Sequence, residues 1–218
     1  MAWIMASTFS GHPMTAFTVL TVCSANRCRS PMAEALLARS LEPTLGGELT
    51  VRSAGFGPSG APAERGALEV MAEIGVDLTS HRSRTVDRAM LAEADLVLAM
   101  TRQHAMELVV LEDSCWPKTF LLGEFTSPSG STGLGGSSSS AVASTGLAAA
   151  PFDRIPDLRD KVALLHAGRR RSDLLALPTS VEVGDPVGGP LRGYRSTRDR
   201  IAELAEAVVA YLAQPEVP

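Results

Sequence analysis

The chain has 218 residues and a formal net charge of −4; 45% of the residues are hydrophobic and 20% are charged. This length suits one domain with enough apolar side chains to bury a core. Because basic residues are not in surplus, the composition gives no reason to expect a nucleic-acid or anionic-membrane partner. No run of about 18 apolar residues occurs, so no membrane-spanning helix is predicted.

Cysteine usage and the N-terminal segment bear on location. The chain has three cysteines, an odd number, and Cys23 and Cys28 are too close in sequence for an ordinary structural disulfide. This usage favours a reducing, cytoplasmic setting. Residues 1–16 lack the basic and apolar stretches of a signal peptide, so we expect a loose N-terminal tail there.

The first part of the chain begins with a strand and a helix. Residues 17–22 are apolar and β-branched, which predicts a buried strand. A helix is expected to begin at Ser30, a good N-cap, because Pro31 suits the first helical position. Pro43 is expected to end this helix, and a second strand is predicted at residues 49–53.

Strands and helices continue to alternate. Helices are predicted at residues 62–74, 102–111 and 194–212, and strands at 95–100 and 118–122. This alternation implies a parallel sheet with right-handed crossovers. The predicted fold class is α/β with three layers, in which helices flank a short parallel sheet of about four strands.

A long insertion is predicted at about residues 126–180, within a single domain formed by residues 17–218. No Asp, Glu, Lys or Arg occurs from position 125 to 152, which is typical of a flexible linker or disordered loop. A helix is predicted at residues 157–171. The insertion could form a lid, or a tether whose basic end at residues 169–171 docks a partner; a solvated insert is the simpler interpretation.

The loop between the first strand and the first helix carries the pattern Cys-x5-Arg, from Cys23 to Arg29, followed by Ser30. A cysteine at a helix N-terminus beside an arginine is favoured as the nucleophilic thiolate. The spacer amides can surround a phosphate, and the guanidinium offers a planar pair of donors. Alone the pattern is weak, but an apolar strand before it and a Ser-Pro helix start after it favour a phosphate site.

Residues 22–35 resemble the signature of low molecular weight protein-tyrosine phosphatases. The resemblance continues at residues 51–55, 80–84, 94–100 and 185–186. It implies a cysteine-dependent phosphomonoesterase of the protein-tyrosine phosphatase class, which works through a phosphocysteine and needs no metal or cofactor. The implied substrate is a phosphorylated protein or a small phosphomonoester.

The resemblance also implies roles for the loop residues. Cys23 is the nucleophile, Arg29 binds the phosphate, and Ser30 donates a hydrogen bond to the thiolate. The other loop residues support the cradle: Ser24, Ala25, Asn26, Arg27 and Cys28.

Two of these loop residues have implied partners. Asn26 would hold the loop in a left-handed turn and bond with Ser53 and His81, although His81 alone would be read as a solvated loop histidine. Cys28 would form a reversible disulfide with Cys23, unless it only packs.

Asp185 is the implied general acid, because the leaving oxygen needs a proton and Asp185 precedes the last helix. An Asp-Pro pair is also a common turn, so this role depends on the resemblance. Asp153 and Asp157, in the insertion, are the alternative candidates for the acid.

The pocket walls depart from the family pattern. Ala25 stands where glycine is usual and would be strained at a positive φ. Apolar residues are usual at Ser24 and Arg27, and an aromatic residue at Val187, which leaves Phe56 as the best aromatic candidate. We therefore hypothesise a reduced preference for phosphotyrosine, with Arg27 favouring an anionic substrate.

Two other functions compete with the phosphatase. An arsenate reductase of the same fold needs two further cysteines to pass a disulfide outward, and only Cys115 lies outside the loop. A phospho-ligand-binding module that has lost its chemistry is the other alternative, but the presence of Cys23, Arg29 and Asp185 argues against it.

Overall fold

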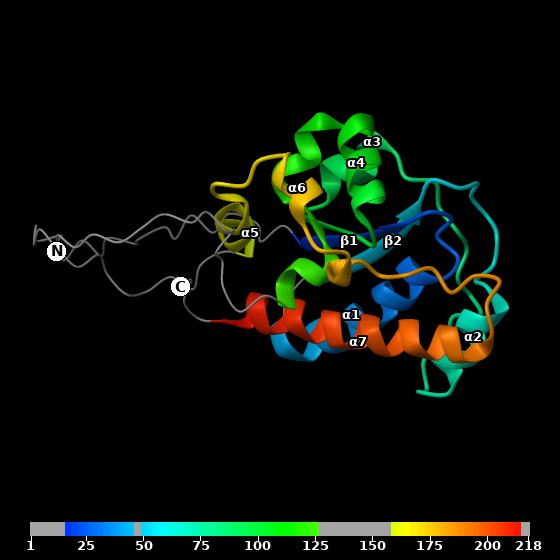
Figure 1. Cartoon of the computed structure of the whole chain (residues 1–218). Helices are drawn as coiled ribbons and strands as arrows, with labels where there is room; N and C mark the ends of the chain where they lie inside the picture. Colours follow the sequence, from blue (N-terminus) through cyan, green and yellow to red (C-terminus); the bar gives the residue numbers. More distant parts are fainter. Residues whose placement is uncertain (1–15, 46–48, 127–157, 215–218) are drawn as a thin grey trace, which may run out of the picture.

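A parallel sheet of four strands forms the centre of the molecule (Figure 1). The computed structural model describes residues 16–45, 49–126 and 158–214. The strands are β1 (Phe17–Cys23), β2 (Leu49–Gly55), β3 (Leu96–Ala99) and β4 (Thr119–Leu121), in the order β2-β1-β3-β4. Every pairing between them is parallel, so the predicted fold class is confirmed.

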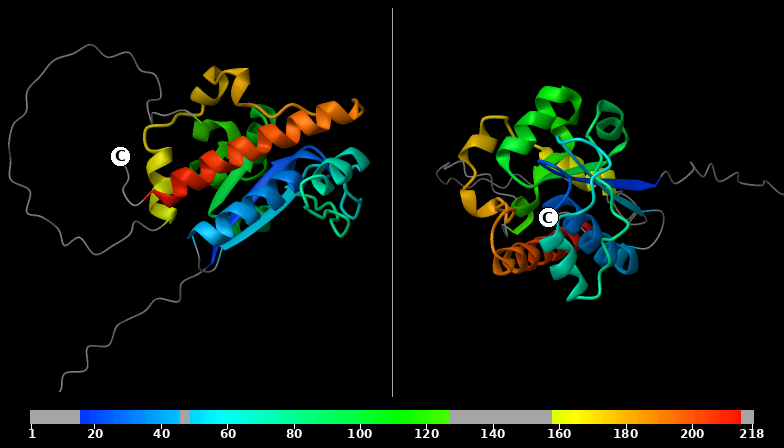
Figure 2. Two further views of the ribbon diagram at one scale, coloured as in Figure 1. Left: turned by 90° about the horizontal axis from the view of Figure 1, so that it is seen from below. Right: turned by 90° about the vertical axis from the view of Figure 1, so that its right-hand side faces the viewer.

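Helices cover both faces of this sheet (Figure 2). On one face lie α1 (Arg29–Leu45), α2 (Arg65–Ala72) and α7 (Leu191–Ala213), and on the other α3 (Arg88–Glu93), α4 (Arg102–Leu111) and the 3-10 helix η1 (Asp113–Lys118). Alternate strand residues face opposite layers: Val19 packs with α1 and α7, whereas Leu20 packs with α3 and α4. The alternation creates two cores that share one sheet.

The C-terminal part of the predicted insertion packs on the domain. Its elements are α5 (Leu158–His166), α6 (Asp173–Ala176) and η3 (Thr179–Val181). Arg169 lies with its guanidinium carbon 4.0 Å from the ring centre of Phe120 and 4.7 Å from that of Trp116, and it forms an ion pair with Glu124 at 3.1 Å. Because this side chain is occupied and 7% exposed, Arg169 does not offer the free cation suggested for docking a partner. Residues 127–157, which include most of the uncharged stretch, lie outside the described residues, as do residues 1–15 of the predicted tail.

The predicted limits of four helices are wrong, and one of them is the start of α7, at Leu191 rather than at residue 194. Pro43 does not end α1, which continues to Leu45, because a proline in the last turn removes only one backbone hydrogen bond. α2 begins at Arg65 rather than at residue 62, since the Glu64 amide donates to the Arg27 carbonyl at 2.7 Å and keeps that segment extended. α5 ends at His166, before Gly168 with φ 81°.

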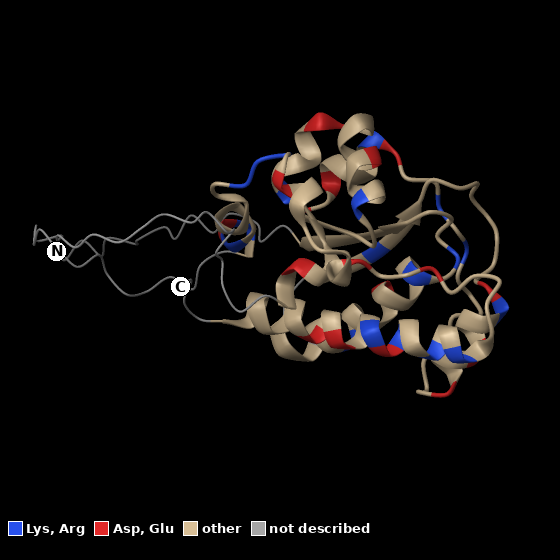
Figure 3. Cartoon of the chain, viewed as in Figure 1, with Lys and Arg blue, Asp and Glu red and all other residues tan. Residues whose placement is uncertain are grey.

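Charged residues of both signs lie along α7, with arginines in its first part and Glu203 and Glu206 in its last part (Figure 3). Arg195 and Arg198 form ion pairs with Glu73 at 2.6 and 2.9 Å, at the end of α2. These pairs connect two helices of the same layer. Within the described part of the chain, no helix is long and apolar enough to cross a membrane.

Candidate active site

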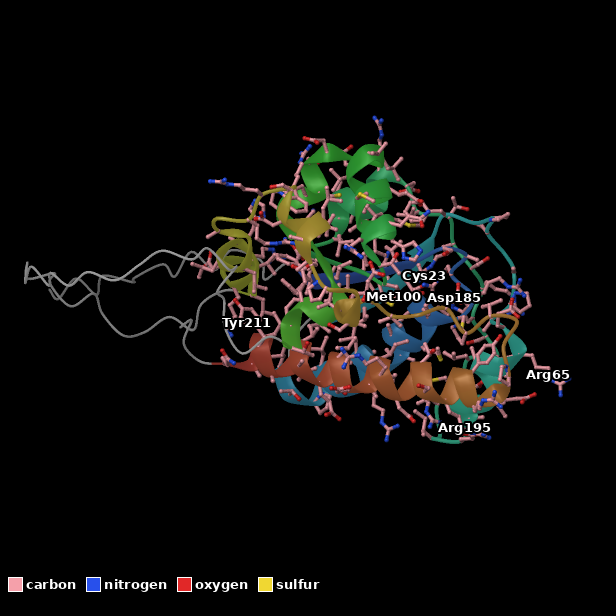
Figure 4. The ribbon with its side chains drawn as sticks, in the orientation of Figure 1. Cys23, Arg65, Met100, Asp185, Arg195 and Tyr211 are labelled. Carbon is pink, nitrogen blue, oxygen red and sulfur yellow. The ribbon has the colours of Figure 1, made fainter. Side chains whose placement is uncertain are left out.

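The carboxyl ends of the central strands meet at one edge of the sheet. Cys23 is the last residue of β1 and is 3% exposed. Figure 4 shows Cys23, Met100 and Asp185 at this end of the molecule, away from Tyr211. In parallel α/β sheets, ligands bind at this edge.

The phosphate loop, residues 23–30, turns sharply between β1 and α1. Asn26 has φ 53°, the left-handed conformation predicted for it. Ala25 has no positive φ, so the strain considered for an alanine at this position does not arise. Gly55 of β2 lies directly beneath the loop: a Cβ there would be 2.6 Å from the Asn26 nitrogen and 2.8 Å from the Cys23 oxygen. The close approach explains why this position needs glycine.

The thiol of Cys23 lies 3.0 Å from the Ser30 hydroxyl oxygen. That oxygen accepts a hydrogen bond from the Asn26 side-chain nitrogen at 2.9 Å. The hydroxyl hydrogen can then point to Cys23 Sγ or to the Ala54 carbonyl at 3.2 Å. This arrangement can give a thiolate a hydrogen-bond donor.

Further contacts fix Asn26. Its side-chain nitrogen also donates to the Ser53 hydroxyl at 2.8 Å, and its side-chain oxygen accepts from the Arg84 amide at 2.8 Å. His81 Nε2 lies 2.7 Å from the Asn26 carbonyl oxygen. The structure therefore brings Ser53 and His81 to Asn26. It adds Glu34, which accepts from the Ser53 hydroxyl and which sequence reasoning missed.

Arg29 is buried, with 4% of its side chain exposed. Its Nη2 donates to Asp185 Oδ2 at 2.6 Å and to Ser24 Oγ at 3.1 Å, and its Nη1 donates to the Val183 carbonyl at 3.3 Å. Within the described residues, the buried Nε has no hydrogen-bond partner. A buried guanidinium N–H without a partner is costly, so this atom is a ready donor for a bound anion.

Asp185 reaches the loop from the acid loop, residues 183–190. The Val183 amide donates to the Met100 carbonyl at 2.8 Å, which ties the start of the acid loop to the end of β3. The carboxyl of Asp185 is 45% exposed, and its Oδ1 accepts from the Val187 amide at 3.2 Å. The other candidates for the acid, Asp153 and Asp157, lie outside the described residues.

The two remaining cysteines are buried free thiols. Burial, followed by the charges of Asp185 and Cys23, raises the pKa of Cys28 to about 12, so this thiol is neutral at ordinary pH. Cys115 packs in the other core, across the sheet from Cys23 and Cys28. Burial also raises the pKa of Cys115.

The pocket walls differ in part from the sequence hypothesis. Arg27 Nη1 pairs with Glu64 Oε1 at 3.0 Å, and Arg27 Nε donates to the Pro62 carbonyl at 3.0 Å. Glu64 therefore compensates much of the charge that was expected to attract an anionic substrate. Phe56 stacks on His104 with 6.1 Å between ring centres, and Val187 is 51% exposed.

His104 is a site residue that sequence reasoning missed. It lies in the first turn of α4, is 5% exposed, and its Nε2 is 2.9 Å from Ser24 Oγ. A histidine one turn into a helix that follows a central strand could have been noted, because that position faces the carboxyl edge of the sheet.

Comparison with known proteins supports the same reading. The model of a family described as low molecular weight phosphotyrosine protein phosphatase matches residues 18–135, more than half of the chain. The chain belongs to this family. Its members share a cysteine-based mechanism, so the chain is a cysteine-dependent phosphatase.

Relatives and neighbours within the family carry two kinds of name. EpsP of Ralstonia nicotianae, a probable low molecular weight protein-tyrosine-phosphatase, is 41% identical over 108 residues, covering 49% of this chain and 71% of its own. A protein-arginine-phosphatase of Geobacillus stearothermophilus is 28% identical over 197 residues, covering 90% of this chain and 96% of its own. The crystal structure of a YwlE mutant from Bacillus subtilis has a TM-score of 0.63 at 27% identity and covers 91% of this chain and 100% of its own.

Proposed function

We propose that Cys23 is the nucleophile, Arg29 the phosphate-binding residue and Asp185 the general acid of a protein phosphatase. The observation that carries this proposal is the position of Arg29. Its Nη2 bonds with the acid, and its Nε has no partner among the described residues. A phosphate in the loop would supply the missing acceptor and lie between the thiol and the carboxyl.

The reaction proceeds in two displacements. The Cys23 thiolate attacks phosphorus in line, the bond from phosphorus to the leaving oxygen breaks, and Asp185 transfers its proton to that oxygen. Asp185, now a carboxylate, then takes a proton from water. The water oxygen attacks phosphorus, the phosphorus–sulfur bond breaks, and inorganic phosphate and the thiolate are released.

The contact between Asp185 and Arg29 belongs to the free enzyme in this scheme. Asp185 Oδ2 accepts from Arg29 Nη2 at 2.6 Å, a charge-assisted hydrogen bond. A bound phosphate dianion competes for the same guanidinium and places a negative charge beside the carboxyl. Substrate binding would therefore weaken the contact with Arg29 and leave the Asp185 carboxyl to face the leaving oxygen.

Phosphotyrosine in a protein is the substrate that we propose first. Support comes from the EpsP relative, named a tyrosine phosphatase, and from Phe56, whose ring stacks on His104 beside the loop. Phosphoarginine is the second candidate. The relative that covers 90% of this chain is named an arginine phosphatase, and the wall residue Ser24 is polar and exposed, which suits a leaving group rich in N–H donors.

Matched peptides separate these two substrates. One peptide sequence, carrying either phosphotyrosine or phosphoarginine, is compared by kcat/KM at one pH. A higher value for the phosphotyrosine peptide supports the first candidate, and a higher value for the phosphoarginine peptide replaces it with the second.

Further features are proposed with this function. We propose that residues 17–218 act as one phosphatase domain with 1–16 as its tail, in the cytoplasm, where the three free thiols would stay reduced. Cys28 would form a reversible disulfide with an oxidised Cys23. An arsenate-reductase relay gains no support, because Cys115 packs in the other core. Oxidation of thioredoxin that depends on arsenate would revive it.

The test of the mechanism is hydrolysis of para-nitrophenyl phosphate, with reductant and without metal, by the wild type, Cys23→Ser and Asp185→Asn. We expect an active wild type, an inactive Cys23→Ser and a strongly slowed Asp185→Asn. An Asp185→Asn variant with full activity would move the acid to Asp153 or Asp157. A wild type that binds phosphate but hydrolyses nothing would make the chain a binding module.

A further inference from the structure

His104 has no part in the mechanism above, yet it connects to the phosphate-binding arginine through one side chain. It begins a row of three contacts: His104 Nε2 to Ser24 Oγ at 2.9 Å, Ser24 Oγ to Arg29 Nη2 at 3.1 Å, and Arg29 Nη2 to Asp185 Oδ2 at 2.6 Å. The row runs from a buried helix residue to the acid loop. It therefore links α4 to the phosphate loop and to the acid loop.

The chemistry of the groups fixes the direction of the bond to Arg29 and allows one of two directions for the bond to His104. Arg29 Nη2 can only donate, so Ser24 Oγ accepts from it. The single hydroxyl hydrogen of Ser24 is then free to donate to His104 Nε2. His104 Nε2 accepts it in the neutral tautomer whose ring hydrogen is on Nδ1, 2.9 Å from Thr101 Oγ1. One neutral tautomer of His104 satisfies all of these contacts.

The surroundings keep this imidazole neutral. Burial, followed by the positive charge of Arg29, lowers the pKa of His104 to about 4, against weaker opposing effects of Glu107, Asp185 and Glu182. An imidazolium would point an N–H at Ser24 and place a second cation near Arg29. A neutral histidine with its hydrogen on Nδ1 is thus the form that can accept the Ser24 hydrogen.

We propose that His104 is a positioning residue that orients Arg29 through the Ser24 hydroxyl. By accepting the Ser24 hydrogen, His104 holds the oxygen so that its lone pair engages Nη2. With the Val183 carbonyl on Nη1, this contact fixes the plane of the guanidinium and leaves Nε for the phosphate. This inference rests on the proposed role of Arg29 as the phosphate-binding residue.

The test is competitive inhibition by inorganic phosphate in four proteins: wild type, Ser24→Ala, His104→Leu and the double variant. Loss of one neutral hydrogen bond should raise the inhibition constant about threefold to tenfold in each single variant. The double variant should bind phosphate no more weakly than the weaker-binding single variant, because both substitutions break the same connection. His104→Gln, which keeps an acceptor and a donor, should recover part of the loss.

Other outcomes overturn the proposal. Losses that multiply in the double variant would mean that His104 acts independently of Ser24, as a packing residue would. An unchanged phosphate inhibition constant in Ser24→Ala would also overturn it. The inhibition constant of Ser24→Ala still decides the question if His104→Leu does not fold, because Ser24 is exposed and its loss removes little packing.

Two further proteins complete the experiment. Gln103→Leu, on the exposed side of the same helix turn, is the matched control and should bind phosphate like the wild type. Arg29→Ala is measured in the same assay. If Arg29→Ala binds phosphate normally, the proposed role of Arg29 has failed; if it binds weakly while Ser24→Ala binds normally, only the inference about His104 has failed.

Discussion

In the phosphate loop, the side-chain amide nitrogen of Asn26 donates to Ser30 at the end of the loop and to Ser53 of β2, and its side-chain oxygen accepts from the Arg84 amide. In the acid loop, by contrast, Asp185 is 45% exposed and bonds with Arg29 and with the Val187 amide. The first region is a rigid receptor whose geometry exists before substrate arrives. In the proposed mechanism, the second holds a group that changes partners during the reaction. The difference teaches that the proposed site combines a fixed phosphate-binding loop with an acid that can move its proton.

The largest expected effect is the fall in kcat when Asp185 is replaced by a residue that cannot donate a proton. Asp185→Asn keeps the shape of the side chain but cannot donate a proton, so kcat should fall about a hundredfold to ten-thousandfold. The fall in kcat/KM, which reports the first displacement alone, should be smaller for para-nitrophenyl phosphate than for a phosphotyrosine peptide, because nitrophenolate leaves without help. Equal losses of kcat/KM for both substrates would contradict the role of Asp185 as an acid.

Gly55→Ala tests the rigidity of the phosphate loop. The new Cβ would be 2.6 Å from the Asn26 nitrogen and 2.8 Å from the Cys23 oxygen, so the backbone of the phosphate loop must shift. A shift of about 1 Å costs about a hundredfold in rate, which kcat/KM would report. The matched control in the acid loop is Gly184→Ala, where a Cβ meets nothing within 4 Å. Similar activity in the two variants would show that the phosphate loop is not rigid.

Sequence reasoning was strongest where the structure is local. The loop could be predicted because one strand, eight consecutive residues and one helix start create it together. Ser53 and His81 came only from the family resemblance, since the residues between them and Asn26 carry no sign of the contact. His104, Glu34 and Glu64 were missed because their partners lie on other elements. The start of α2 was misplaced for the same reason: the Glu64 amide bonds with Arg27, and helix propensity does not encode such a contact.

A further prediction concerns the burial of Cys28 in the phosphate loop. Its folded pKa of about 12 lies above the value of 9.0 for an unburied thiol. Stability from the neutral thiol is therefore complete below pH 9.0 and is lost as the pH rises through about 12. Relative to Cys28→Ser, whose hydroxyl does not titrate there, the wild type should lose about 1 kcal/mol of unfolding free energy per pH unit above 9.0. The measurement is urea unfolding of both proteins at about pH 8 to 10, either side of the unburied value. Unfolding free energies that change with pH in parallel for the two proteins would contradict the burial of Cys28.

The smallest effect concerns the pocket wall. Glu64→Gln removes the charge that compensates Arg27, whose side chain is 37% exposed. Affinity for an acidic phosphopeptide should rise relative to a neutral one, by less than about fivefold, because exposed ion pairs are weak. Glu69→Gln, which loses a pair with the exposed Arg65 on the same helix, is the control. If both variants keep the wild-type preference, Arg27 has no influence on substrate charge.

The central claim is that Cys23 carries the phosphoryl group between the two displacements, and mass spectrometry of Asp185→Asn after rapid quenching tests it most directly. With para-nitrophenyl phosphate, this variant should form the phosphocysteine but hydrolyse it slowly, because water lacks its base. The account predicts one added phosphoryl group, located on Cys23 and absent when Cys23 is also replaced by alanine. A phosphoryl group on another residue, or steady turnover with no phosphorylated enzyme at any quench time, would contradict it.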